Sequence, residues 1–304
     1  MQEFLHIPVL LQEVVDAFEL VPGDMFFDGT LGAGGHAKAI LEKNKNIKKY
    51  IGVDQDAEAL EAAKKNLEAF GQVEYEHSNY ENAIDDFCDN TFGGILADIG
   101  VSSYQIDNAE RGFSFLHDGP LDMRMNKDNT LTAEDVVNTY SETELANVIY
   151  NYGEERESRK IAAKIVKARQ QKRITTTGEL KNIVSAAVFK NPASAVQRTF
   201  QAIRIEVNDE LGVLKRFISK AFQKLRKGGR LAIISFHSLE DRIVKQAFAD
   251  FSRDCICPPS FPVCVCGHKR TGELVTKKPV VASVEELKHN KRSSSAKLRV
   301  IEKL

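Results

Sequence analysis

The stretch over residues 26–36 constrains the fold of this chain most strongly. An apolar run ends at Asp28, a glycine-dense loop follows, and helical spacing begins at Gly35. Glycines let the backbone turn sharply and let a ligand approach without meeting a Cβ atom. The free N–H groups at the start of the next helix favour a polar ligand. This order of strand, glycine loop and helix predicts an α/β fold of the nucleotide-binding type.

The same alternation continues along the first hundred residues. Strands are expected over 25–27, 50–53, 73–76 and 94–98, with helices from residue 8, over 35–42 and after the capping residue at 56. Alternating strands and helices predict a mostly parallel sheet with helices on both faces. Asp28, Asp54 and Asp98 each end an apolar run. We therefore expect all three at the carboxyl edge of the sheet, where such folds bind ligands.

The pattern changes after residue 130, where only helical periodicity is found up to about residue 205. This part includes the capping box Ser141-x-x-Glu144. Strand character returns over 230–235 and 297–301. The sequence therefore predicts an α/β domain formed by residues 1–107 and 206–304. An all-helical insert for substrate recognition, residues 108–205, interrupts it.

Composition sets limits on the class of protein. The 304 residues, 42% of them hydrophobic, suffice for one large domain or two ordinary ones with full cores. A net charge of -1 indicates no general affinity for nucleic acid, so any basic surface is local. No apolar run reaches the roughly 18 residues of a membrane helix. The first six residues lack the pattern of a signal peptide, so we expect a cytoplasmic protein without membrane contact.

Two ligands compete for the glycine loop. The spacing Gly32-x-Gly34-x-x-Ala37 fits a dinucleotide fingerprint, which would indicate NAD. Asp28 would repel a pyrophosphate, however, and the glycines lie deeper in the loop than a pyrophosphate turn needs. S-adenosylmethionine (SAM) carries a cationic amine and a sulfonium, which suit a carboxylate. Asp54 has the spacing of a ribose-binding acid, and the loop chemistry favours SAM.

Three residues are candidates for catalysis. Asp98 could accept a hydrogen bond from an exocyclic base amine and localise its lone pair, could hold the ammonium group of the donor, or could only cap its loop. Phe236 could stack on a nucleobase, and His237 could move a proton. The alternative for this segment is that Ser238 caps a helix beside a structural histidine.

Two other segments have both a functional and a structural interpretation. The long loop over 111–124 mixes aromatic, glycine and charged residues, so Phe113 and Phe115 could form a base-binding lid, or the loop could simply connect domains. Basic residues recur mostly three or four apart between 156 and 173, as a phosphate-binding stripe or a solvated helix face. They are Arg156, Arg159, Lys160, Lys164, Lys167, Arg169, Lys172 and Arg173.

Four of the five cysteines lie within twelve residues as two Cys-x-Cys pairs, Cys255 with Cys257 and Cys264 with Cys266. In a reducing compartment this density favours a metal over disulfides. A structural zinc is one interpretation, although Cys-x-x-Cys is the commoner zinc spacing, and a reduced loop without metal is the other. Cys88 is isolated, and we expect it to be buried.

Taken together, the motifs resemble the bacterial 16S rRNA (cytosine-N4)-methyltransferase family, the ribosomal small subunit methyltransferases H, nearly from end to end. The resemblance rests on His6-x-Pro8-Val9-Leu10-Leu11, Asp28-Gly29-Thr30-x-Gly32-x-Gly34-Gly35-His36, Asp98-x-Gly100-Val101-Ser102-Ser103, Arg111-Gly112-Phe113-Ser114-Phe115, Gly119-Pro120-Leu121-Asp122-Met123-Arg124, Tyr152-Gly153-Glu154-Glu155-Arg156, Arg198-Thr199-Phe200-Gln201-Ala202 and Ser235-Phe236-His237-Ser238-Leu239-Glu240-Asp241-Arg242.

The resemblance implies a class I SAM-dependent methyltransferase, with a Rossmann-like, mostly parallel seven-stranded sheet and a helical insert. It implies N4-methylation of a cytidine in the decoding region of 16S rRNA, with the small ribosomal subunit as partner. It also implies a set of donor contacts, namely Gly34, Gly35, His36, Asp54, Tyr80, Asp98 and Gln105. The cysteine loop is not common to every member and is not expected to be catalytic. An NAD-dependent oxidoreductase and a SAM-binding assembly factor without turnover remain the alternatives. The oligomeric state, a homodimer included, is left open.

Overall fold

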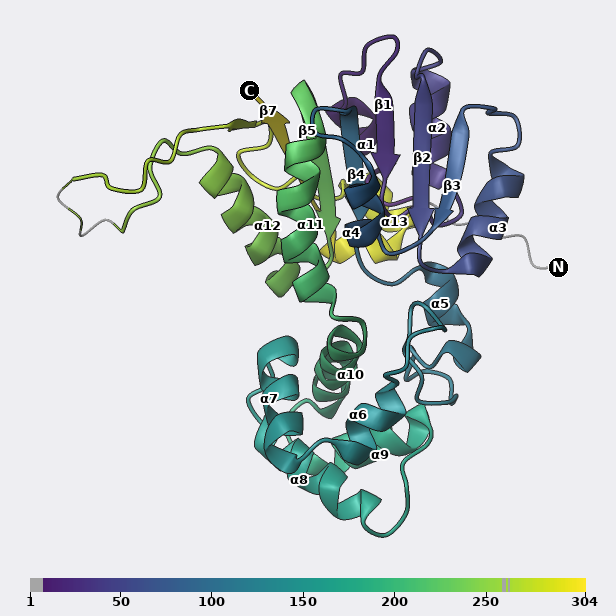
Figure 1. Ribbon diagram of the computed structural model, residues 1–304. Helices are drawn as coiled ribbons and strands as arrows, with labels where there is room; N and C mark the ends of the chain where they lie inside the picture. Colours follow the sequence, from purple (N-terminus) through teal and green to yellow (C-terminus); the bar gives the residue numbers. More distant parts are fainter. Residues whose placement is uncertain (1–7, 259–260, 262) are drawn as a thin grey trace. The chain divides into compact units, whose positions relative to one another are not determined.

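The computed structural model describes residues 8–258, 261 and 263–304 (Figure 1). His6 of the family motif and the segment considered for a signal peptide lie outside the described residues. The chain forms two compact units, Met1–Gly100 with Leu211–Leu304, and Val101–Glu210. Among the described helices, none has both the length and the apolar character needed to cross a membrane.

The first unit is built on a sheet whose described strands follow the order β3-β2-β1-β4-β5-β7-β6. The strands are β1 (Met25–Asp28), β2 (Lys49–Asp54), β3 (Val73–His77), β4 (Phe92–Asp98), β5 (Leu225–Ser235), β6 (Gly272–Leu274) and β7 (Lys297–Lys303). Neighbours among β1 to β5 are parallel, and β7 is antiparallel to both β5 and β6. The expected mostly parallel seven-stranded sheet is confirmed.

Helices cover both faces of this sheet. They are α1 (Leu11–Ala17), α2 (Gly35–Lys43), α3 (Ala57–Asn66), α4 (Tyr80–Ala83), α11 (Glu210–Lys224), α12 (Ser238–Phe251) and α13 (Val284–His289). Successive strand residues point to opposite faces, so Phe26 packs with α1 to α3 and Phe27 packs with α11 and α12. Both rings are fully buried, each worth roughly 1.5–3 kcal/mol by transfer. The two cores pack on opposite faces of the central strands, which carry Asp28 and Asp98.

The second unit is helical and has a core of its own. Its helices are α5 (Ser103–Asp107), α6 (Ala133–Thr139), α7 (Glu142–Gly153), α8 (Ser158–Arg169), α9 (Thr177–Ala187) and α10 (Pro192–Asn208). The predicted capping box at Ser141 and Glu144 is present at the start of α7. The loop before α6 is fixed by the buried Arg111, whose guanidinium donates to the carbonyls of Arg124 and Met125 at 3.1 and 3.0 Å. The all-helical character expected of this segment is confirmed.

Two local predictions are wrong. The first helix begins at Leu11 rather than at Pro8, because Leu10 adopts a left-handed conformation with φ of 53° and its N–H donates to Glu286 Oε1 at 2.9 Å. Cys88 is exposed rather than buried, since it follows a short helical turn at the surface. The short elements β6 and α13 were not anticipated, because three and six residues are too few for a periodic signal.

Candidate functional site

The carboxyl edge of the sheet gathers three acidic side chains. Asp28, Asp54 and Asp98 are the last residues of β1, β2 and β4. β1 lies between β2 and β4, and Asp28 is in register with Gly52 on one side and Leu96 on the other. The strand order reverses between β1 and β4, which is where open α/β sheets bind their ligands. The predicted gathering of the three carboxyl groups is confirmed.

Asp28 lies beneath the glycine loop and is 1% exposed. Its Oδ2 atom accepts a hydrogen bond from the Tyr50 hydroxyl at 2.8 Å, and its Oδ1 atom accepts one from the Thr30 N–H at 3.1 Å. Burial raises the pKa of this carboxyl group to about 7, although both hydrogen bonds oppose the shift. Asp28 therefore anchors the start of the loop.

Asp54 anchors the same loop from the neighbouring strand. Its Oδ2 atom accepts the Gly32 N–H at 2.8 Å, and its Oδ1 atom accepts the Asp56 N–H at 2.9 Å. The side chain is half-buried, and loss of water around it raises its pKa to about 6. Each carboxylate oxygen has a second lone pair, so both can also accept a hydroxyl from a ligand.

The glycine loop is shaped by positions where a side chain would not fit. Gly34 caps α2 with φ of 84°, a left-handed conformation that other residues adopt at a cost. A Cβ atom on Gly34 would lie 2.9 Å from Leu67, and one on Gly35 would lie 2.4 Å from Pro8. The glycines therefore let the loop and the first turn of α2 pack closely. The first N–H groups of a helix have no partner within the helix itself, which makes such a turn suited to a polar ligand.

His36 connects this loop to Asp98. Its Nε2 atom lies 2.9 Å from the carbonyl oxygen of Val9, which can only accept, so Nε2 carries the proton of the neutral ring. Its Nδ1 atom lies 3.9 Å from Asp98 Oδ2. The ring is buried, and Nδ1 is the ring nitrogen nearer to the carboxyl group of Asp98.

Asp98 is the least satisfied polar group at this edge. Its side chain is 18% exposed, and its Oδ1 atom accepts no hydrogen bond from the described part of the chain. Burial, followed by the charges of Asp28 and Glu240, raises its pKa to about 8. A buried carboxyl oxygen without a hydrogen bond is costly, and such groups concentrate at functional sites.

The end of β5 contributes a second cluster. His237 is the N-cap of α12, and Glu240 completes a capping box with it. The interpretation of Ser238 as the cap is therefore wrong. The Nδ1 atom of His237 accepts the Glu240 N–H at 3.4 Å. Its Nε2 atom lies 3.1 Å from Glu240 Oε1, but it forms no hydrogen bond of acceptable geometry with the described residues. Capping of α12 gives the His237 side chain a structural role, and proton transfer by His237 stays a prediction.

Phe236 precedes this cap and lies beside the chain that follows Asp98. Its ring is half-buried, and a Cβ atom on Gly100 would lie 3.6 Å from its Cδ2 atom. Its N–H donates to Glu240 Oε2 at 2.8 Å, which fixes the backbone of the turn. A partly accessible ring beside Gly100, two residues after Asp98, is compatible with stacking on a flat ligand.

Tyr80 closes the other side of the glycine loop at the start of α4. Its ring packs edge-to-face on Phe217 with centroids 4.7 Å apart. A Cβ atom on Gly29 would lie 2.8 Å from the Cβ atom of Tyr80. The residue therefore lies directly against the loop, where the resemblance implies a donor contact.

Gln105 belongs to the second unit and is buried there. Its Oε1 atom accepts the Ser102 N–H at 3.1 Å as part of the capping box of α5. A donor contact by Gln105 stays a prediction. Phe113 is 9% exposed within the helical core, and Phe115 packs on Phe200 with centroids 5.4 Å apart. The ring of Phe113 is used in packing within the helical core, and base binding by this loop stays a prediction.

The basic stripe divides into paired and unpaired residues. Arg169 donates to the carbonyls of Val137 and Tyr140 at 2.7 and 2.5 Å, so it ties α8 to α6. Lys160, Lys172 and Arg173 each pair with a glutamate. The remaining cations are exposed, and their side chains have no ionic partner among the described residues; they are Arg156, Arg159, Lys164 and Lys167.

Sequence reasoning missed three supporting residues, Thr30, Tyr50 and Glu240. The hydroxyl of Thr30 accepts the Asp98 N–H at 2.6 Å, and Tyr50 holds Asp28. Glu240 is 2% exposed and sits three residues after His237, the spacing of a capping box with histidine in place of serine. That spacing could have identified Glu240, whereas Thr30 and Tyr50 have no local signal.

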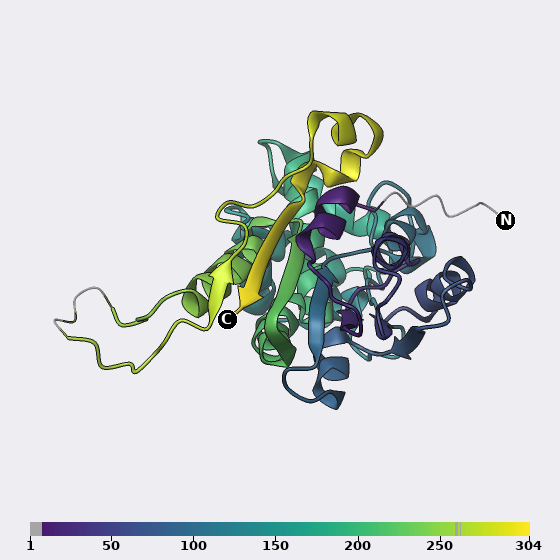
Figure 2. The same ribbon diagram turned by 90° about the horizontal axis from the view of Figure 1, so that it is seen from above.

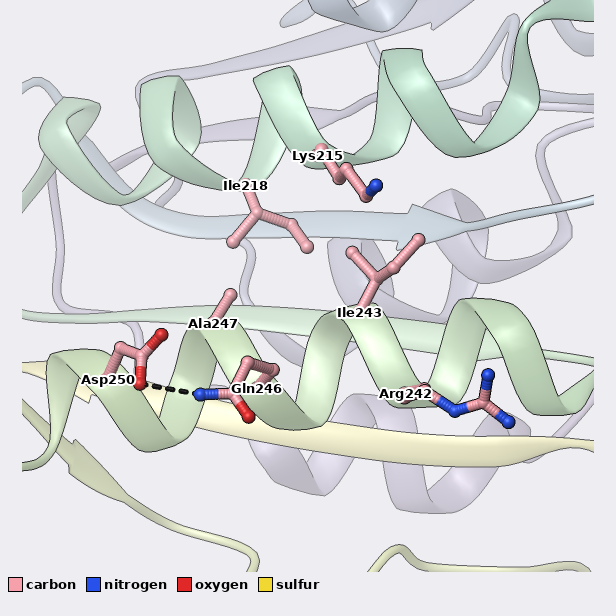
Figure 3. Close-up of a pocket in the computed structure, with 7 residues that line it drawn as sticks. All are labelled: Lys215, Ile218, Arg242, Ile243, Gln246, Ala247 and Asp250. Atoms are coloured by element: carbon pink, nitrogen blue, oxygen red, sulfur yellow. Dashed lines mark hydrogen bonds between the residues drawn. The ribbon is translucent and has the colours of Figure 1, made fainter. Parts of the chain in front are cut away.

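A shallow groove of about 300 Å³ lies between α11 and α12 (Figure 3). Ile243 and Ala247 lie between Arg242 at one end of the groove and Asp250 at the other (Figure 3). Gln246 donates to Asp250 at 2.7 Å. The lining residues are Lys215, Ile218, Arg242, Ile243, Gln246, Ala247 and Asp250. None of them is an expected site residue.

The carboxyl edge fits a cationic nucleoside better than a dinucleotide. Where they are ionised, Asp28, Asp54 and Asp98 would repel phosphates, whereas a positive ligand would favour the ionised forms of all three. The strand order, with an antiparallel β7 inserted beside β5, is that of the class I SAM-dependent methyltransferases. Fold and site together define a protein of this class.

Comparisons with known proteins specify the family. Residues 3–304 match the model of the MraW methylase family, and the chain belongs to that family. The "Ribosomal RNA small subunit methyltransferase H" of Clostridium botulinum (strain Kyoto / Type A2) is 49% identical, covering 99% of this chain and 100% of the relative. The protein of the same name from Symbiobacterium thermophilum is 52% identical, covering 99% and 97%. A solved methyltransferase homologue from Pyrococcus horikoshii is 14% identical with a TM-score of 0.46, covering 100% and 71%.

Proposed function

We propose that this methyltransferase transfers the methyl group of SAM to N4 of a cytidine in the decoding region of 16S rRNA. The names of the relatives support ribosomal RNA of the small subunit as the substrate. The observation that carries the choice of an exocyclic amine is the buried Oδ1 atom of Asp98, which accepts no hydrogen bond within the described chain. An amine N–H is a donor that fits this acceptor.

The residues around the glycine loop fit the donor. Asp54 offers two carboxylate oxygens to the ribose hydroxyls, and the first turn of α2 after Gly34 offers N–H groups. Tyr80 would border the bound donor from the side of α4. When bound, the donor supplies an electrophilic methyl group, and the electrons of the broken C–S bond remain on sulfur.

Asp98 would prepare the nucleophile. The N4 lone pair of cytosine is delocalised into the ring, and a hydrogen bond from its N–H to Asp98 Oδ1 helps to localise it as the new N–C bond forms. The surplus proton on N4 passes to Asp98. His36 Nδ1, 3.9 Å from Oδ2, can then stabilise or take that proton. Phe236 would hold the base by stacking beside Asp98.

The raised pKa of Asp98 links donor binding to this role. With a pKa of about 8, the carboxyl group is largely protonated in the free protein at neutral pH. A cationic donor nearby lowers that pKa and so favours the ionised, accepting form. A second role for the same oxygen is to hold the donor's ammonium group, which the same observation supports.

The helical unit would supply contacts to the RNA backbone. The unpaired cations of α8, Arg156, Arg159, Lys164 and Lys167, are exposed along one helix and its N-terminal approach. Four such charges suit a run of phosphates. Because the whole chain carries a net charge of -1, general RNA affinity is low and a structured ribosomal surface is the better substrate.

The test is nucleoside mass spectrometry after incubating SAM and enzyme with small ribosomal subunits that lack the modification. Wild-type protein should produce N4-methylcytidine, Asp98→Asn should produce very little, and the exposed control Asp86→Asn should match wild type. A methyl group on C5, on a ribose, on an adenine or on a protein would refute the proposal. Donor binding without any methyl transfer would instead indicate a SAM-binding assembly factor.

A further inference from the structure

The segment between α12 and β6 brings together the two Cys-x-Cys pairs. In both views the described parts of this segment, residues 252–258 and 263–271, extend away from the helices and strands of the first unit (Figures 1 and 2). The Sγ atoms of Cys255, Cys257, Cys264 and Cys266 all lie within 4.8 Å of one another. The four thiols are free, so neither pair forms a disulfide.

The distances between the sulfur atoms match a metal site. Cys264 and Cys266 are 3.6 Å apart at sulfur, and Cys266 and Cys255 are 3.8 Å apart. A zinc ion with Zn–S bonds of about 2.3 Å in tetrahedral geometry separates its sulfur ligands by about 3.8 Å. A disulfide would need about 2.05 Å. The thiols are therefore too far apart to be bonded and suitably spaced to share one ion.

The backbone around the cluster is arranged to hold negative sulfur. The N–H of Cys257 donates to Cys255 Sγ at 3.4 Å, and the N–H of Val265 donates to Cys257 Sγ at 3.4 Å. Gly267, immediately after the last cysteine, has φ of 62° and turns the chain back toward β6. Donors directed at ligand atoms are the outer contacts that orient metal ligands.

Little else in the described part of this segment could hold its shape. Ile256, Val263 and Val265 are exposed rather than packed into a core. The base of the segment is closed by His268, which lies 2.8 Å from the Asp250 carbonyl, and by the Thr271 N–H to the Phe251 carbonyl at 2.9 Å. Ordering a long loop that has no core costs conformational entropy, and a metal crosslink can offset that cost.

The cluster lies far from the catalytic edge of the sheet. α12 starts beside the carboxyl end of β5 and its 14 residues carry the chain about 21 Å away. Gly272 of β6 pairs with Lys303, at the end of the sheet opposite Asp98. Four cysteines also leave no open coordination position, which is the character of a structural rather than a catalytic site.

We propose that Cys255, Cys257, Cys264 and Cys266 bind one structural zinc ion that orders the loop between α12 and β6. The proposal is independent of the methylated base, because none of these side chains belongs to the donor or substrate site. The ligands are thiolates, so binding releases protons and weakens at acidic pH.

The test uses the full chain made in zinc-supplemented medium and purified without chelator. Elemental analysis should find about one zinc per chain in wild type and in the control Cys88→Ser, which removes an exposed cysteine outside the cluster. The double variant Cys255→Ser with Cys264→Ser, one from each pair, should lose at least nine-tenths of the metal. Trypsin should cut the loop at Arg253, Lys269 or Arg270 much faster after zinc removal, while donor affinity stays unchanged.

Cobalt substitution keeps the proposal testable if the double variant folds poorly. Wild-type protein loaded with cobalt should show thiolate-to-cobalt charge transfer and the intense visible bands of tetrahedral coordination. Wild type without zinc, with all five thiols reacting at once under native conditions, would overturn the proposal. So would equal zinc content in the double variant, iron in place of zinc, or a cobalt spectrum without charge transfer.

Discussion

Replacing Asp98 by asparagine should stabilise the donor-free protein while removing methyl transfer. The carboxyl group is buried, its Oδ1 atom has no partner in the described chain, and its pKa is raised from 3.8 to about 8. Each pKa unit corresponds to about 1.4 kcal/mol, which sets an upper limit of about 6 kcal/mol on the cost of this group above pH 8. Since the side chain is 18% exposed and its surroundings can relax, we expect a gain of about 2–3 kcal/mol.

The pH dependence has a definite sign. The unfolded chain releases the Asp98 proton near its ordinary pKa, whereas the folded chain keeps it until about pH 8. The folded state therefore binds more protons between about pH 4 and pH 8, and its stability falls as the pH rises through that window. Asparagine has no proton to release. The advantage of Asp98→Asn should therefore grow from about 1 kcal/mol near pH 5.5 to its full value near pH 8.5.

Urea unfolding of donor-free protein at these two pH values measures the effect. Asp54→Asn is the matched control, because both oxygens of Asp54 accept backbone N–H groups and the amide of asparagine would face one of these donors. Because the pKa of Asp54 is raised only to about 6, the relief in that control should be smaller than for Asp98 and complete by about pH 6. The lost backbone hydrogen bond should offset it to within about 1 kcal/mol. If Asp98→Asn is no more stable than wild type near pH 8.5, or gains equally at both pH values, the reasoning about a buried unpaired carboxyl group is refuted.

Three further predictions concern the donor, the loop and the RNA. Asp54→Ala should weaken SAM binding by on the order of 2–4 kcal/mol in calorimetry with little change in turnover at saturating donor; unchanged affinity would remove Asp54 from the donor site. Gly34→Ala should lower the free energy of unfolding by about 1–2 kcal/mol, because Gly34 has a φ of 84° and an added Cβ atom would meet Leu67. The control Gly71→Ala has open space around it and should lower that free energy by less than half as much in the same urea assay. Charge reversal at unpaired cations of the stripe should reduce the slope of log RNA affinity against log salt concentration by roughly 0.9 per lost duplex phosphate contact. Donor affinity should not change. Equal slopes in variant and wild type would mean that the stripe is a solvated helix face. The reversed residues are Arg159, Lys164 and Lys167, with Lys65, Lys245 and Lys278 reversed as the control.

Several features of the site were predictable from the sequence because they depend on local rules. Parallel strands that each end in an acid place those acids at one edge, so Asp28, Asp54 and Asp98 could be grouped before their neighbours were known. The capping box of α7 depends on four consecutive residues and needs no tertiary information. The period of the apolar residues likewise separated the helical segment from the α/β part.

Other features depend on residues far apart in the chain. The raised pKa of Asp98 comes from burial and from the charges of Asp28 and Glu240, which lie 70 positions before it and 142 after it. Phe113 lies in a loop of mixed polar and aromatic residues, and only the tertiary structure shows that its ring packs into the helical core. That His237 caps α12 depends on its geometry relative to Glu240, and its proposed proton transfer stays a prediction.

What the sequence determined by itself is therefore the alternation of the longer strands and helices and the acidic residues that end β1, β2 and β4. Only the tertiary structure decided which side chains find a hydrogen-bond partner or lie close enough to share a ligand. Whether Asp98 Oδ1 finds a donor, or whether the Cys255 and Cys264 pairs come within reach of one ion, depends on chain segments that meet only after folding. Hydrogen bonding and desolvation act over a few ångströms of space, and distance along the chain does not determine that spacing.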